Sequence, residues 1–184
     1  MKRALWMWGW VPVLAAIIIA LDQWSKAWIR AKIPLNGESF PYPALAPYFR
    51  LVHWANSGAA FGILRGQGNL FIAIAVIVIV VVLIYLRQLP ANQWPVRLCL
   101  AFQLGGALGN LIDRLRFGKV TDFLLFTLPL NGRELSWPAF NVADSSIVVG
   151  VLLLAYLLIL EEGRRSEKPG RPAEKSPAAA DDTH

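Results

Sequence analysis

The sequence predicts an all-α integral membrane protein with four transmembrane helices. Of its 184 residues, 56% are hydrophobic and 16% are charged, whereas a soluble globular domain has about 25% charged residues. The hydrophobic residues gather into four long runs, each close to the ~20 residues that a helix needs to cross the hydrocarbon core. Tryptophans lie near the ends of the runs, where amphipathic rings favour the lipid headgroup level. Four such runs leave too little polar surface for a soluble fold.

The first run follows Lys2 and Arg3 and therefore resembles a signal peptide. It leads directly into Asp22 without a small-x-small cleavage site, so we expect it to be retained as a span. The second run has no charged residue from Leu70 to Leu86. The predicted spans are residues 6–28, 69–87, 96–113 and 141–160, within a membrane domain of residues 1–160.

The third run carries small residues every four positions, at Ala101, Gly105 and Gly109. This spacing lets helices pack closely in lipid. Asn110 and Arg114 share one face of the same predicted helix, with Asp113 beside them.

The segments between the spans form two outward loops, residues 30–68 and 114–140. Residues 48–54 (YFRLVHW) are rich in strand formers and are flanked by turn residues. Residues 161–184 are charged and rich in proline and alanine, which is typical of a disordered tail. The Lys and Arg residues are nearly equally divided between the two sides. Because the short loop and the termini carry more weight in the positive-inside rule, we expect both termini, and hence the tail, to be cytoplasmic.

The composition also excludes several other classes of protein. Cys99 is the only cysteine, which excludes a disulfide scaffold. His53 and His184 are the only histidines, so we expect no Cys/His metal site. The net charge of +6 does not predict nucleic-acid binding, because the basic excess lies in loops and span ends. There it suits anionic lipid headgroups.

Four aspartates are the informative charged residues. The other eight acids lie in loops or from the end of the fourth span onward. Since successive spans alternate in direction, Asp22, Asp113, Asp122 and Asp144 all converge on the outer boundary of the membrane. An ionisable residue at membrane depth marks a functional site by default.

Structural roles are the alternative for each aspartate. Asp22 can pair with Lys26 one helical turn away, Asp113 with the adjacent Arg114, and Asp144 can cap the fourth helix. Asp122 has only Lys119 close in sequence, and Asp144 has no cation nearby. Mutual repulsion and poor solvation let such a pair share one proton, which is the arrangement of an aspartic protease. A proton-coupled transporter would also place acids in the membrane.

Five motifs in chain order make the sequence resemble the bacterial lipoprotein signal peptidase (signal peptidase II) family. The motifs are residues 21–26 (LDQWSK), 56–62 (NSGAAFG), 105–114 (GGALGNLIDR), 120–123 (VTDF) and 140–144 (FNVAD). Two features depart from the family pattern: the stretch between Asp122 and Asn141 is long, and the polar tail is extra.

The resemblance implies a four-helix membrane bundle with a small extracytoplasmic β-sheet in the bacterial inner membrane. It implies an aspartic endopeptidase with its active site at the periplasmic boundary among membrane lipids. We expect a monomer without metal or cofactor. The implied substrates are prolipoproteins with a diacylglyceryl-modified cysteine, cleaved on the N-terminal side of that cysteine. By motif the catalytic pair is Asp122 and Asp144. The positions that shape the site or hold substrate are Asp22, Lys26, Asn56, Asn110, Asp113, Arg114 and Asn141.

The alternative function is a small proton-coupled membrane transporter that uses the same aspartates. It predicts a polar stripe across the bundle. The second span has no polar residue between Leu70 and Ile84, which favours the peptidase.

Overall fold

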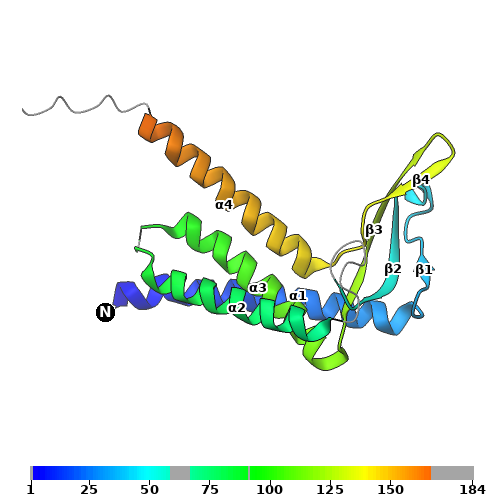
Figure 1. The fold of residues 1–184 in the computed structure, drawn as a ribbon, viewed down its shortest axis with the longest axis horizontal. Helices are drawn as coiled ribbons and strands as arrows, with labels where there is room; N and C mark the ends of the chain where they lie inside the picture. The colour runs from blue at the N-terminus through cyan, green and yellow to red at the C-terminus, as the bar shows by residue number, and fades with distance from the viewer. Residues whose placement is uncertain (1, 59–66, 91, 167–184) are drawn as a thin grey trace, which may run out of the picture.

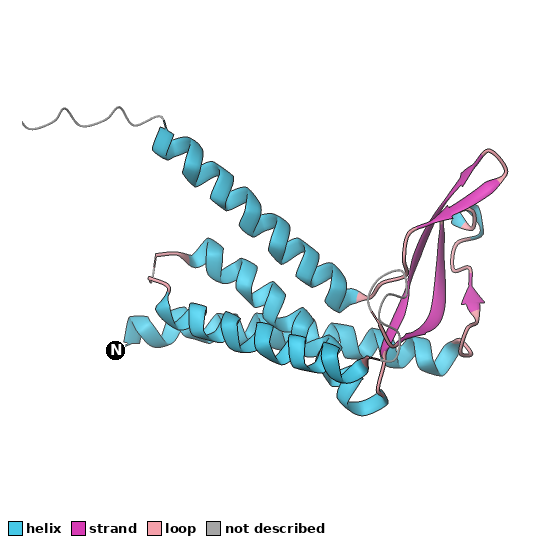
Figure 2. Ribbon diagram, in the orientation of Figure 1, coloured by secondary structure: helices cyan, strands magenta, loops and turns pink. Residues whose placement is uncertain are grey.

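Four helices dominate the computed structural model, which describes residues 2–58, 67–90 and 92–166. Each is long and apolar enough to cross a membrane, and the three that precede the last one run side by side (Figures 1 and 2). Together with a small antiparallel sheet, they confirm the predicted fold class. The helices are α1 (Lys2–Lys32), α2 (Gly68–Gln88), α3 (Trp94–Phe117) and α4 (Val142–Ser166), and a short 3₁₀ helix spans Pro43–Leu45.

Three helices run past the ends of the predicted spans. The helix α1 continues to Lys32, so residues 30–32 are helical and not part of the first outward loop. The helix α3 continues to Phe117, so Arg114 and Arg116 lie in its last turn and not in the outward loop. Gly118 then ends it with a left-handed φ of 71°, the usual glycine stop. The helix α4 continues through residues 161–166, and residues 167–184 of the predicted tail lie outside the described part of the chain.

The helix α3 is the centre of the bundle. More than half of its span is buried, whereas the spans of the other three helices are mostly exposed, as lipid-facing helices are. Small residues bring its backbone close to both neighbours. A Cβ on Gly105 would lie 2.8 Å from Cβ of Ile18 in α1, and Gly106 faces the carbonyl oxygen of Ala143 in α4. The close packing predicted from the small-residue spacing is therefore present.

A four-stranded antiparallel sheet lies across one end of the bundle (Figure 1). Its order is β1 (Glu38–Ser39), β2 (Phe49–Asn56), β3 (Val120–Leu130) and β4 (Arg133–Ser136). The strand expected over residues 48–54 is β2. The strands β3 and β4 form a hairpin inside the second predicted loop, and its tip extends past the start of α4 (Figure 1).

The hairpin turns at Asn131 and Gly132, with φ of 50° and 75°, as a two-residue type I′ turn requires. Arg50 of β2 holds the hairpin to the rest of the sheet. Its guanidinium pairs with Glu38 of β1 at 3.0 Å and with Glu134 of β4. This row of charges follows one face of the sheet over three strands.

Candidate active site

The four aspartates meet where the sheet crosses the end of the bundle. Asp22 lies within α1 and Asp113 within α3. Asp122 is the third residue of β3, and Asp144 lies in the first turn of α4. Asp22, Asp113 and Asp122 are buried, and Asp144 is partly buried. The convergence expected from the alternation of spans is therefore present, and Asp122, expected in the second outward loop, lies on the strand β3.

Asp22 and Asp113 belong to a buried ion cluster built around Lys26. The Lys26 Nζ lies 2.8 Å from Asp22 Oδ2 and 3.5 Å from Asp113 Oδ2. All three side chains are fully buried. Arg30 adds a second cation 3.7 Å from Asp113 Oδ1, so two carboxylates face two cations. The pairing of Asp22 with Lys26 is the one expected from their spacing, whereas Asp113 pairs with α1 residues and Arg114 lies over the Phe71 ring.

Asp122 and Asp144 are joined through Asn141. The Asn141 side-chain nitrogen donates to Asp122 Oδ1 at 2.8 Å, and its backbone N–H donates to Asp144 Oδ2 at 3.2 Å. Each carboxylate accepts a second amide hydrogen bond. Asn56 Nδ2 donates to Asp122 Oδ2 at 2.9 Å, and Asn110 Nδ2 donates to Asp144 Oδ1 at 2.7 Å. The two carboxylates are thus held side by side by neutral donors.

The surroundings of Asp122 favour its protonated form. Burial and then the negative charge of Asp144 raise the pKa of Asp122 from 3.8 to about 7. Hydrogen bonds from Asn56 and Asn141 and the charge of Lys26 oppose this rise. A carboxyl with a pKa near 7 is protonated in about half of the molecules at neutral pH, whereas an ordinary aspartate is almost fully ionised, so Asp122 is suited to act as a general acid.

The ion cluster and the aspartate pair are mechanically connected. Lys26 Nζ donates to Asn110 Oδ1 at 2.9 Å, and the amide of Asn110 donates onward to Asp144. Asp22 Oδ1 accepts the backbone N–H of Ala143 at 2.9 Å, which satisfies an otherwise unpaired donor at the start of α4. The buried cluster therefore fixes both the side chain and the backbone of Asp144.

Three contacts at the start of β3 were not foreseen from the sequence. Arg30 Nη1 donates to Thr121 Oγ1 at 2.9 Å, and the backbone N–H of Thr121 donates to Asp113 Oδ2 at 3.0 Å. Gln23 Nε2 donates to Asp113 Oδ1 at 3.1 Å. The first two contacts hold Thr121, the residue before Asp122, and the third holds the Asp113 carboxylate that accepts the Thr121 N–H. The one signal in the sequence was that Arg30 lies one helical turn after Lys26 and Gln23 one turn before it.

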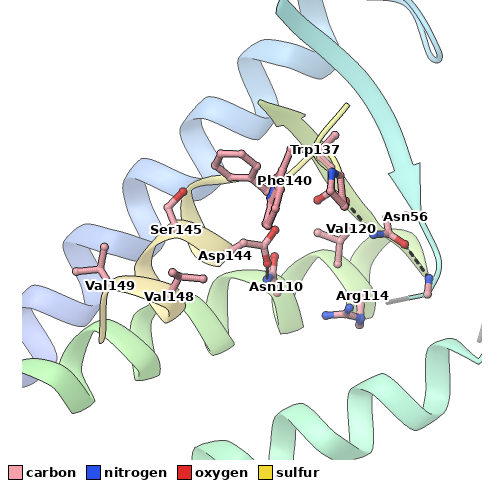
Figure 3. A pocket seen from close by; sticks show the side chains of 14 residues that line it. Asn56, Asn110, Arg114, Val120, Trp137, Phe140, Asp144, Ser145, Val148 and Val149 are labelled. Carbon is pink, nitrogen blue, oxygen red and sulfur yellow. Dashed lines mark hydrogen bonds between the residues drawn. The ribbon is translucent and has the colours of Figure 1, made fainter. Parts of the chain in front are cut away.

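An open pocket of about 560 Å³ leads to the aspartate pair. Figure 3 shows Asp144, Asn110, Arg114 and Asn56 on its polar side and Trp137 and Phe140 beside them. Val148 and Val149, from the α4 span, complete the apolar side. The pocket therefore joins a pair of carboxylates to the apolar surface of the α4 span.

The remaining candidate groups lie apart from this pocket. The ring nitrogen Nδ1 of His53 lies 2.8 Å from the carbonyl oxygen of Ile33, and Cys99 is buried within α3. In the described part of the chain, no three His, Cys, Asp or Glu side chains are arranged to hold a metal ion. Of the motif at residues 56–62, only residues 56–58 are described. Asn56 bonds Asp122, and its Oδ1 accepts the backbone N–H of Gly58 at 2.9 Å.

Fold and site together define a class of protein: a multi-pass membrane protein with a paired-aspartate pocket bordered by an apolar span at one end of its helices. Comparison with known proteins gives the family. The model of the family described as signal peptidase (SPase) II matches residues 14–160, and the chain belongs to this family.

Relatives match over most of their length. A lipoprotein signal peptidase of Moorella thermoacetica is 43% identical over 85% of this chain and 97% of its own. A lipoprotein signal peptidase of Brevibacillus brevis is 44% identical over 83% of this chain and 96% of its own. A solved structure described as a bacterial membrane enzyme at 2.3 Å superposes with a TM-score of 0.76 and 27% identity, over 89% of this chain and 96% of its own. These relatives favour the peptidase over the transporter.

Proposed function

We propose that this chain is an aspartic endopeptidase that removes signal peptides from prolipoproteins. Its family and its relatives carry that activity in their names. The observation that supports the aspartic mechanism is the Asp122–Asp144 pair, held by Asn141 at the mouth of a pocket between sheet and span. The substrates are prolipoproteins whose cysteine carries diacylglycerol, and the cut falls on the N-terminal side of that cysteine.

The two aspartates divide the acid and base roles. Asp122 holds the shared proton and Asp144 is ionised. Asp144 removes a proton from a water molecule between the carboxyls, and the water oxygen attacks the scissile carbonyl carbon. The Asp122 proton hydrogen-bonds the oxyanion that develops. Collapse of the tetrahedral intermediate breaks the C–N bond, and Asp144 returns its proton to the leaving amine.

Neighbouring polar groups hold the peptide and the pair. Asn56, Asn110 and Asn141 orient the two carboxylates. Arg114 lines the pocket without a short ion pair to either aspartate among the described contacts, so its guanidinium is positioned to hold a peptide carbonyl. The buried ion cluster of Asp22, Lys26 and Asp113 lies beneath these residues and supports them structurally. Apolar groups of Trp137, Val148 and Val149 face the lipid-modified part of the substrate.

The enzyme works as a monomer in the bacterial inner membrane, surrounded by lipid. Both termini lie in the cytoplasm, and the sheet and the aspartate pair lie at the periplasmic boundary. This orientation rests on the Lys and Arg residues of the termini and of the short connection between α2 and α3.

The decisive experiment is cleavage of a diacylated prolipoprotein in detergent by Asp122→Asn and Asp144→Asn. Each variant keeps the size of the side chain and removes the acid. Both are expected to lose turnover by several orders of magnitude, because neither proton transfer has a substitute. Glu38→Gln, an exposed carboxylate change on the sheet, is the matched control and keeps wild-type turnover. Retained turnover in either folded aspartate variant contradicts the assignment.

Substrate class is tested separately, with the same prolipoprotein lacking its lipid. The lipidated form is expected to be cleaved far faster. Equal rates on both forms would contradict the specificity while leaving the aspartic mechanism intact.

A further inference from the structure

The β3–β4 hairpin has two chemically different faces. Directly opposed residues of an antiparallel pair share a face, and the register pairs Leu128 with Leu135 and Pro129 with Glu134. One face carries Pro129 and Glu134, the latter bound to Arg50. The other carries five large apolar side chains, here named the apolar ribbon. Its members are Phe126, Leu128, Leu130, Leu135 and Trp137, each between 47% and 67% exposed.

The apolar ribbon lies on the same face of β3 as Asp122, because both follow the even positions of the strand. Trp137 extends the pairing, since its N–H donates to the carbonyl oxygen of Phe126 at 2.9 Å. From Phe126 to Leu130 the ribbon is about 13 Å long at ~3.3 Å per residue. It therefore continues outward from the site toward the tip of the hairpin.

The ribbon faces the same side as the α4 span. Trp137 and Pro138 line the site pocket together with Val148 and Val149 of α4 (Figure 3). The same two residues also line a second hollow of about 380 Å³, formed on the hairpin by Phe126, Leu128 and Leu135. The apolar surface is thus continuous from the lipid-facing span to the hairpin, which runs across the helix ends and beyond them (Figure 1).

We infer that the apolar ribbon docks on the outer leaflet of the membrane that the helices span. A contiguous exposed apolar surface marks an interaction site, and this one continues the lipid contact of α4. Trp137 has the amphipathic ring that favours the interface. Arg133 is paired with Leu130 at the tip and shares the ribbon's face, so its guanidinium meets the lipid phosphates. The hairpin is an interfacial anchor that holds β3, and with it Asp122, against the bilayer.

The test reads lipid contact at single positions. Cys99→Ala removes the one cysteine, and Leu130→Cys or Leu135→Cys then places an environment-sensitive fluorophore on the ribbon. Pro129→Cys, exposed on the opposite face, is the matched control. The full-length variants are placed in phosphatidylcholine–phosphatidylglycerol nanodiscs, with or without lipids that carry a doxyl quencher high on the acyl chain. Thermal unfolding checks the fold of each variant, and Leu128→Cys replaces any that fails.

Ribbon labels are expected to emit at shorter wavelength and to be quenched several-fold more than the Pro129 label. Equal quenching of labels on the two faces of the hairpin overturns the inference. Labels on both faces that are not quenched at all also overturn it. Ribbon labels that are shielded from water but not quenched by doxyl lipid also overturn it. The ribbon would then be covered by protein: the substrate, a second copy, or residues 59–66 of the same chain. None of these readouts depends on the proposed peptidase activity.

Discussion

Asp122 is the residue whose proton links activity to pH. Its pKa of about 7 means that it loses the shared proton as the pH rises through neutrality, so kcat/KM is expected to fall above about pH 7. The hydrogen bond from Asn56 favours the ionised form of Asp122. Asn56→Ala therefore raises the pKa of Asp122, and the alkaline limb of the pH profile moves to higher pH.

The position of the limb, and not the size of the rate, is the measurement. Histidine side chains also titrate near neutral pH, so His53→Gln is the control and is expected to keep the wild-type limb. If the alkaline limb of the pH profile disappears in His53→Gln, or does not move in Asn56→Ala, a group other than Asp122 is responsible for it.

The same carboxyl makes stability depend on pH. A folded pKa raised from 3.8 to about 7 means that the folded state binds more protons than the unfolded state between these values. The free energy of unfolding therefore falls as the pH rises across that window, by up to about 4 kcal/mol at ~1.4 kcal/mol per unit. Asp122→Asn removes this loss, so its melting temperature is expected to exceed that of the wild type at pH 8 and to approach it near pH 4. Equal melting temperatures at pH 8 would contradict the raised pKa.

Lys26 is expected to stabilise the fold strongly. It is fully buried between Asp22 and Asp113, and removing one partner of a buried ion pair costs ~3–5 kcal/mol. Lys26→Met should therefore lower the melting temperature strongly, whereas Lys32→Met, at the exposed end of the same helix, should not. Among the described ion pairs Asp22 has no cation besides Lys26, whereas Asp113 keeps Arg30. Adding Asp22→Asn therefore removes the stranded negative charge and is expected to recover part of the loss. A Lys26→Met variant as stable as Lys32→Met would show that the cluster is not stabilising.

Residue contacts were predictable from the sequence only when they were local. Asp22 and Lys26 are four residues apart on one helix, and their pairing follows from that spacing. Arg30 and Thr121 are 91 residues apart, and nothing in the local pattern relates them. Asp113 likewise has a cation adjacent in sequence, Arg114, but pairs with α1 residues, since helix packing decides which cation is close.

At the scale of elements, the α3–α4 contact sets the position of Asp144. A Cβ on Gly106 would meet the Ala143 carbonyl and, at 2.7 Å, Cγ1 of Ile147. Overpacking of this kind costs ~1–3 kcal/mol and would displace the start of α4 from the sheet. Gly106→Ala is therefore expected to lower both the melting temperature and kcat.

Gly163→Ala is the matched control in the exposed part of α4, where a Cβ would meet nothing within 4 Å. It is expected to leave kcat unchanged and to stabilise the helix by ~0.5–1 kcal/mol. A normal kcat in Gly106→Ala would mean that the α3–α4 contact does not position the aspartate pair.

The elements differ in how far the sequence predicted them. The helices followed from long apolar runs, and β2 from its strand formers. The hairpin was read as a loop, although Asn131 and Gly132 form the strongest short-range hairpin signal. Pro129 obscured it, because proline argues against a strand; the structure accommodates it near the tip of the hairpin, opposite Glu134. The helix ends beyond the apolar runs were also missed. The predicted boundaries followed the fall in hydropathy, whereas α1, α3 and α4 continue as helices through the polar residues that come next.

At the scale of the whole molecule, one inference carried most of the prediction. Successive spans cross the membrane in opposite directions, so the end of one span and the start of the next lie on the same side. The four aspartates could therefore be placed together before any contact was known. The spans could not show that a sheet would cross the bundle end and supply Asp122 from a strand, because the strand pairing joins segments about 70 residues apart in the chain, as Trp54 and Asp122 are.

The orientation of the protein in the membrane is the remaining property at this scale. The Lys and Arg residues are nearly equally divided between the two sides, so the prediction depends on the short segments. The termini and the α2–α3 connection are expected to face the cytoplasm, because short segments dominate the positive-inside rule. In the Cys99→Ala background, Lys119→Cys after α3 is expected to react with a membrane-impermeant maleimide on intact spheroplasts. Asn92→Cys, exposed in the α2–α3 connection, should react only after permeabilisation. The reverse pattern would place the aspartate pair on the cytoplasmic side, where it could not meet a signal peptide whose mature domain has already crossed the membrane.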